Sequence, residues 1–140
     1  MKKNQSRTLH LIDLENLSGC GSCTAALTAD IHRAYMAVVP TSPYDHYIVA
    51  TSHRNFTATA TWPGGFRVVG SGQDGAETAL CAHVLELDVP AHYDHLVVAS
   101  GDHYFAEHVY AWKGAGLAVT VVSRERQISY ALYTAATRFV

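Results

Sequence analysis

The chain has 140 residues, of which 49% are apolar and 16% are charged, and its formal net charge is −2 with histidine taken as neutral. This length predicts one domain spanning residues 1–140, while the apolar content and the small net charge exclude intrinsic disorder. No run of about 18 apolar residues could span a membrane, and no long apolar region follows the first lysines as a secretory signal requires, so we expect a cytoplasmic protein.

Short apolar runs alternate with helical patterns along the chain, which is typical of β-α-β units. One stretch, Asn55–Trp62, is rich in Thr and Ala and predicts either a loop or a short crossover helix. The other elements are predicted, in chain order, as a strand at Leu9–Ile12, a helix at Cys23–Ala37, strands at Tyr47–Thr51 and Phe66–Val69, a helix at Ala76–Leu87, a strand at His95–Ala99, a helix at Phe105–Lys113, a strand at Leu117–Val122 and a helix at Ile128–Phe139.

This order of elements predicts the fold class. Crossovers between parallel strands are right-handed almost without exception, and nearly continuous apolar strands indicate a parallel sheet that is covered on both faces. The predicted fold is therefore α/β, a three-layer α/β/α sandwich with a central parallel five-stranded sheet. Ligands of such sheets bind beyond the carboxyl ends of the strands, so the residues at those ends are the candidates for function.

Acidic side chains follow three of the five predicted strands. Asp13 ends the first strand and Asp102 follows the fourth, while Asp74 and Glu77 follow the third. If these strands are neighbours, the carboxylates converge, and like charges at close range repel each other unless a cation lies between them. Oxygen-rich sites of this kind suit magnesium or manganese, which can activate water for phosphodiester cleavage. Each acid also has a structural interpretation near the start of a helix, although the first helix is expected to begin several residues after Asp13.

Two short motifs offer competing chemistry. The sequence CGSC at Cys20–Cys23 fits a redox or zinc site, but no second cysteine pair or histidine pair accompanies it, and small residues in a tight loop are the alternative. The sequence GSGQDG at Gly70–Gly75 matches the dinucleotide-binding pattern between a strand and a helix. It lies in the third strand-helix unit rather than the first, and Asp74 would place a carboxylate where a pyrophosphate should bind.

Nine histidines stand against only ten lysines and arginines. His53 and His103 fall at the carboxyl ends of predicted strands, where a histidine can contact phosphate or carry a proton. Arg54 and Arg124 lie at the same edge of the predicted sheet. The histidines expected at the surface or half-buried are His10, His32, His46, His83 and His108.

Three pieces of the chain resemble, in order, motifs of the NYN domain, a branch of the PIN-like nuclease superfamily. They are Leu11–Leu17 (LIDLENL), Asp74–Leu80 (DGAETAL) and Val98–Phe105 (VASGDHYF), which resemble the family's first strand end, a helix start and a later strand end. Together they cover elements along most of the chain. The resemblance implies a doubly wound parallel sheet and metal-dependent cleavage of RNA.

The resemblance also assigns residues to the site. Asp13, Glu77 and Asp102 take the positions that bind metal in the family, and Asn16 takes the position of a polar partner beside them. The chain departs from the family pattern in two places. Tyr104 stands where a second aspartate is frequent, and Glu77 stands where the family often has the shorter aspartate.

The leading hypothesis is a metal-dependent ribonuclease that cleaves RNA phosphodiester bonds with bound Mg²⁺ or Mn²⁺. Its predicted metal ligands are Asp13, Asp74, Glu77 and Asp102. Asn16 is expected to orient a carboxylate or a water, and the residues expected to steady the RNA backbone are His53, Arg54, His103 and Arg124. Two alternatives stay open: an inactive module that binds RNA or a protein partner, and a nucleotide binder that uses the glycine-rich loop. An apolar contact with a partner or a second copy could come from Trp62, Trp112, Tyr130 and Tyr133.

Overall fold

A parallel sheet forms the middle layer of the computed structural model, which describes residues 7–19, 24–52, 55–56, 62–70, 75–86, 89–123 and 138–139. Its six strands lie in the order β3-β2-β1-β4-β5-β6, and all neighbouring strands are parallel. The strands are β1 (Thr8–Asp13), β2 (His46–Ser52), β3 (Gly65–Gly70), β4 (His95–Ala99), β5 (Ala118–Val122) and β6 (Arg138–Phe139). The helices are α1 (Leu14–Ser18), α2 (Ala25–Val38), α3 (Gly75–Glu86), α4 (Val89–His92) and α5 (Ala106–Gly114), with a 3₁₀ turn, η2 (His103–Phe105). The predicted α/β fold with five parallel strands is confirmed, and the short strand β6 adds a sixth to the described sheet.

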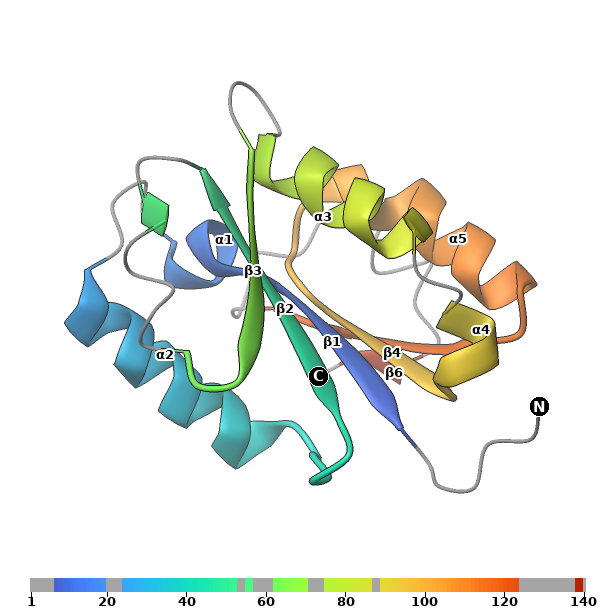
Figure 1. Cartoon of the computed structure of the whole chain (residues 1–140), viewed down its shortest axis with the longest axis horizontal. Coiled ribbons are helices and arrows are strands. Elements are labelled where there is room, and N and C mark those ends of the chain that lie inside the picture. The colour runs from blue at the N-terminus through green and yellow to red at the C-terminus, as the bar shows by residue number, and fades with distance from the viewer. Residues whose placement is uncertain are drawn as a thin grey trace.

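Different helices cover the two faces of the sheet. Figure 1 shows α2 against one face and α3 with α5 against the other. Alternation along β1 places Leu9 and Leu11 in the core under α3 and α5, and Ile12 in the core under α2. This burial on both faces explains why the strands appear in the sequence as nearly continuous apolar runs. Among the helices of the described residues, none combines the length and apolar character that crossing a bilayer requires.

The predicted elements agree with the structure to within a few residues, but two short helices are additional. α1 and α4 contain five and four residues, which is too short for a helical period to show in the sequence. α1 begins at Leu14, directly after Asp13, so the expectation of a later first helix is wrong. It ends at Gly19, whose φ of 73° lies in the left-handed region that glycine adopts most readily.

The last predicted helix also differs from the structure. Arg138–Phe139 forms β6 beside Thr120 and Val121 of β5, so the helix predicted at Ile128–Phe139 is wrong for these two residues. Residues 128–137 lie outside the described residues, as do residues 20–23, which carry the C-x-x-C motif. In the ambiguous stretch, Asn55 and Phe56 form a 3₁₀ turn, and residues 57–61 are not described.

The tryptophans are parts of the core. Trp62 is 3% exposed and belongs to the core on the α2 face of the sheet, and Trp112 is 9% exposed and belongs to the core on the other face. The expectation that they supply a surface for a partner is therefore wrong, because their rings are already covered. Tyr130 and Tyr133, which were expected to share that role, lie outside the described residues.

His10 is completely buried, so its predicted place at or near the surface is wrong. Its Nδ1 lies 2.5 Å from the Tyr35 hydroxyl, its Nε2 lies 2.8 Å from Asp45 Oδ2, and its ring stacks on Tyr47. A neutral imidazole satisfies both bonds when Nε2 donates to the carboxylate and Nδ1 accepts from the hydroxyl. Burial lowers the pKa of His10 despite the neighbouring carboxylate, so the neutral form is favoured.

Candidate active site

The carboxyl edge of the sheet brings Asp13 to the loop that contains Asp102. β1 and β4 are neighbours, with Ile12 opposite Ala99, so Asp13 follows beside Ser100. The Ser100 hydroxyl donates to Asp13 Oδ2 at 2.8 Å, and the backbone N–H of Asp102 donates to Ser100 Oγ at 3.1 Å. Asp13 is 1% exposed. One buried serine therefore connects the two aspartates that the sequence places at strand ends.

Asn16 fastens the same loop from α1. The Gly101 N–H donates to Asn16 Oδ1 at 2.8 Å, across 85 residues of sequence. Asp102 accepts from the backbone N–H of Tyr104 at 2.9 Å, so its carboxylate also stabilises the start of η2. Asp102 therefore caps η2 through Oδ1, as its structural interpretation predicts. This contact fixes the orientation of the Asp102 side chain at the carboxyl edge of the sheet.

Glu15 is a residue of this edge that the sequence analysis missed. Its Oε1 accepts from the Ser52 N–H at 3.0 Å, and its Oε2 accepts from the Ser52 hydroxyl at 2.6 Å and from Asn55 Nδ2. These partners are 37 and 40 residues away in sequence, and no local pattern points to them. The first turn of α1 therefore holds the loop after β2 through Glu15 and the loop after β4 through Asn16.

The helix that carries Glu77 begins at the same edge. A Cβ atom on Gly70, the last residue of β3, would collide with the backbone carbonyl of Gly75, the first residue of α3. This approach accounts for two glycines of the G-x-G-x-x-G pattern without any nucleotide. Glu77 lies in the first turn of α3, and its side chain is not described.

Tyr104 connects the Asp102 loop with α3. Its hydroxyl shares a hydrogen bond of 3.2 Å with the hydroxyl of Thr78, which directly follows Glu77. The tyrosine that replaces the family's frequent second aspartate thus ties η2 to the first turn of α3. The backbone segments that carry Asp102 and Glu77 are therefore neighbours.

The structure describes only part of the remaining predicted site residues. His103 lies in η2 but its side chain is not described, and the residues outside the described part of the chain are His53, Arg54, Asp74 and Arg124. Within the described residues, no three His, Cys, Asp or Glu side chains are grouped closely enough to hold a metal ion. The structure therefore brings together Asp13, Asn16 and Asp102, and the complete ligand set stays a prediction.

The donor chemistry of this edge fits a hard divalent cation. The carboxylates of Asp13, at the end of β1, and Asp102, in the loop after β4, follow neighbouring strands, and the acceptor groups near them include a hydroxyl oxygen and an amide oxygen. Mg²⁺ and Mn²⁺ prefer such oxygen donors over nitrogen or sulfur. We find no described cysteine or histidine side chain in these contacts that would favour a softer metal.

Comparison with known proteins gives a family and a fold. A family model described as the NYN domain matches residues 59–140, which is more than half of the chain. The chain also resembles a crystal structure of a protein of unknown function from Vibrio parahaemolyticus, with a TM-score of 0.66 and 17% sequence identity over 100% of this chain and 95% of that one. None of the curated proteins matches the chain. Asp74, Glu77 and Asp102 fall inside the matched range, whereas Asp13 and Asn16 precede it.

Proposed function

The chain belongs to the NYN domain family, a PIN-like nuclease family, and we propose that it is a metal-dependent ribonuclease acting at the carboxyl edge of its sheet. The observation that supports this proposal best is the pairing of Asp13 with the Asp102 loop through Ser100. Asp13 is 1% exposed and lies beside a second acidic loop, and a cation bound there would stabilise both carboxylates.

The location of these acids supports a ligand site as well. β1 pairs with β2 on one side and with β4 on the other. The chain leaves β1 toward β2 and leaves β4 toward β5, so the connections diverge between β1 and β4, and a crevice forms where the strand order reverses. Asp13 stands at the end of β1 at this reversal. This is the position at which open parallel sheets bind their ligands.

The proposed roles follow from these positions. The carboxylates of Asp13 and Asp102, with those predicted for Asp74 and Glu77, would hold Mg²⁺ or Mn²⁺. A divalent cation bound there supplies positive charge that lowers the pKa of water and offsets the charge that builds up on the phosphate. Asn16 keeps the Asp102 loop in place through Gly101.

The predicted RNA contacts belong to the same proposal. His53 and Arg54 lie between Ser52 and Asn55, the two residues that Glu15 binds. His103 directly follows Asp102, and Arg124 follows the end of β5. Cations at these places would neutralise phosphates and position the strand without reading its sequence.

An inactive RNA- or protein-binding module is the second candidate. The observation in its favour is Tyr104, which stands where the family often has an acid and instead bonds to Thr78. A site with fewer carboxylates binds cations more weakly. Such a module would bind RNA without cleaving it.

Cleavage assays on labelled single-stranded and structured RNA test the proposal. The wild type, Asp13→Asn, Asp102→Asn and a control, Asp30→Asn, are each assayed with Mn²⁺, with Mg²⁺ and with chelator. Asp30 is an exposed carboxylate on α2 that pairs with Arg33, so its loss leaves the edge intact. We expect metal-dependent cleavage that survives only in the wild type and Asp30→Asn. Binding without cleavage would support the inactive module, and cleavage by both edge variants would overturn the assignment. Circular dichroism verifies that each variant is folded.

A further inference from the structure

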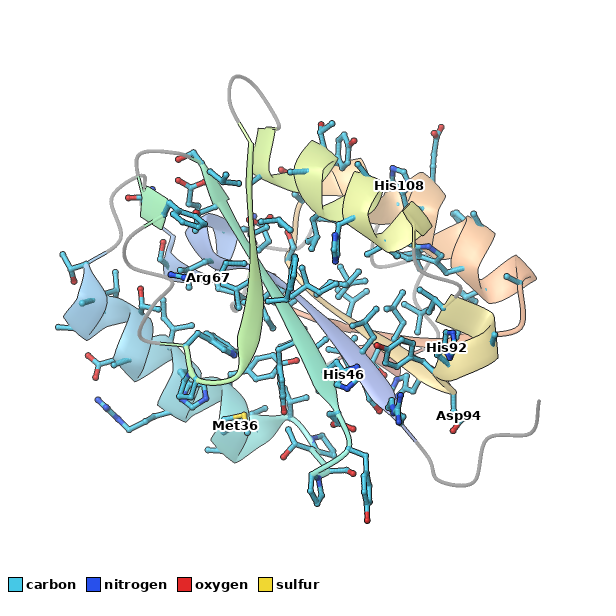
Figure 2. All side chains as sticks on the ribbon, in the orientation of Figure 1. Met36, His46, Arg67, His92, Asp94 and His108 are labelled. Carbon is cyan, nitrogen blue, oxygen red and sulfur yellow. The ribbon has the colours of Figure 1, made fainter. Side chains whose placement is uncertain are left out.

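A cavity of about 260 Å³ lies at the opposite end of the sheet from the acidic edge. Its apolar floor includes Leu9 and Ile48, both almost completely buried. His46, at the start of β2, lines the cavity, and Figure 2 shows it at the end of β2 that lies away from α1. His46 and Ser52 are the first and last of the seven residues of β2, and the six steps between them span about 20 Å at the usual rise per residue. The cavity is therefore separate from the proposed cleavage site.

One wall of the cavity is a stacked pair of rings. Phe66 on β3 and His83 on α3 lie with their centroids 4.5 Å apart and their planes inclined by 14°. Phe66 remains 57% exposed although one face of its ring is covered by His83. A large apolar ring exposed beside a cavity is a common element of binding sites, because a ligand can cover it.

The other wall carries hydrogen-bonding groups. His46 Nδ1 lies 2.6 Å from the Tyr93 hydroxyl, and the Arg7 guanidinium lies 5.9 Å from the centre of the Tyr93 ring. Within the described part of the chain, His46 Nε2 and both ring nitrogens of His83 have no hydrogen-bond partner. A neutral imidazole can donate or accept, so these nitrogens suit a ligand with both kinds of group.

The chemistry of the side chains that line the cavity indicates the class of ligand. Among the described residues that line the cavity, none is an acid, a lysine or an arginine, so the part of the ligand that enters should be uncharged. An apolar floor and a stacked ring pair favour a flat aromatic group, and the free imidazole nitrogens favour a heterocycle with polar edges. The volume lies just below the roughly 300–1,000 Å³ of pockets for whole drug-sized ligands, which suits one base.

We propose that this cavity binds a nucleobase, which belongs either to an RNA strand or to a free nucleotide. The RNA version rests on the proposed function, because a strand held in this cavity would continue toward the acidic edge. The base would lie against the open surface of Phe66, with its polar edge toward His46.

Binding measurements test the proposal, and they are made in chelator so that RNA is not cleaved and no metal ion binds to His46 or His83. The titrations use a labelled 12-nucleotide single strand, the same strand with abasic sites, and nucleoside monophosphates as competitors against ribose 5-phosphate. Phe66→Ala removes the stacking ring. Tyr110→Ala is the matched control, since Tyr110 is 55% exposed but lies on α5 away from the cavity.

We expect Phe66→Ala to weaken RNA binding about tenfold, as loss of one base-stacking contact does, and Tyr110→Ala to leave it unchanged. The ring resonances of His46 and His83 should shift with a nucleoside monophosphate and not with ribose 5-phosphate. A Phe66-dependent effect limited to the monophosphates identifies a free nucleotide as the ligand. Equal binding by wild type and Phe66→Ala for both RNA and nucleotides overturns the proposal.

The outcome is distinguishable from that of the nuclease proposal. If Phe66-dependent binding is found but no RNA is cleaved with any metal, the cavity proposal stands and the nuclease proposal fails. If RNA is cleaved in an Asp13-dependent way but Phe66→Ala binds every ligand normally, the cavity proposal fails alone. His83→Ala provides a second variant, because it opens the other side of the stacked pair.

Discussion

The substitution Ser100→Ala removes one hydroxyl from the connection between Asp13 and Asp102. That hydroxyl donates to Asp13 Oδ2 at 2.8 Å and accepts from the Asp102 N–H at 3.1 Å. Ser100 itself is completely buried, so no bulk water replaces it without rearrangement. The change therefore removes one hydrogen-bond donor from a buried carboxylate and one acceptor from the start of the Asp102 loop.

The magnitude follows from these two bonds. A hydrogen bond to a charged group contributes about 1.5–3 kcal/mol and a neutral one about 0.5–1.5 kcal/mol. We expect Ser100→Ala to lower the free energy of unfolding by about 3 kcal/mol. With a urea m-value of about 2 kcal/mol/M, this moves the unfolding midpoint down by roughly 1.5 M.

Equilibrium urea unfolding followed by circular dichroism measures this shift. Ser42→Ala is the matched control, because the Ser42 hydroxyl accepts one exposed hydrogen bond from Tyr44 at the other end of the sheet. Its free energy of unfolding should change by no more than about a few tenths of a kcal/mol, which is usual for surface changes. A Ser100→Ala midpoint equal to that of Ser42→Ala would refute the view that this serine stabilises the acidic edge.

Three further predictions concern other parts of the molecule. Glu15→Gln should lower the free energy of unfolding by about 1–2 kcal/mol in a denaturant titration, because an amide accepts fewer of the three hydrogen bonds and loses the charge. Burial lowers the pKa of His10 in the folded chain, so the stability that His10 contributes is present above about pH 6.5, the unfolded value, and is lost as the pH falls. His10→Gln should therefore make the free energy of unfolding depend less on pH between about pH 7.5 and 5.5. An unchanged slope in denaturant titrations over this range would contradict the prediction. Gly70→Ala should destabilise the fold by more than 2 kcal/mol in thermal melts, because its methyl group collides with the Gly75 carbonyl, whereas Gly114→Ala, with nothing within 4 Å of the added methyl, should not.

The strands could be predicted because their sequences are locally unambiguous. His95–Ala99 is an apolar, β-branched run, and β4 has the predicted bounds. α1 could not be predicted, because its five residues follow the strand without a turn residue between them. At Arg138–Phe139 the helical spacing of the sequence predicts a helix, but these residues form a strand because they pair with β5.

The site was predictable only where its residues follow strand ends. The positions of Asp13, Asn16 and Asp102 follow from the order of strands, and the structure places their loops together. The partners of Glu15 and the carboxylate beside His10 lie 35 to 40 residues away in sequence. Such contacts depend on three-dimensional packing, so no local pattern could indicate them.

The central position of β1 has a consequence for the order of folding. β1 pairs with β2 across a connection that contains α1 and α2, but its other neighbour is β4, and Asp13 and Ser100 are 87 residues apart in the chain. Long-range parallel pairing of this kind is slow, because loop closure must precede any stabilising contact. A chain still emerging from the ribosome can thus pair β1 with β2 and β2 with β3 while the edge of β1 that binds β4 is still unpaired. The two aspartates can meet only once β4 has paired with β1, so a chain that ends before β4 would carry no assembled acidic edge.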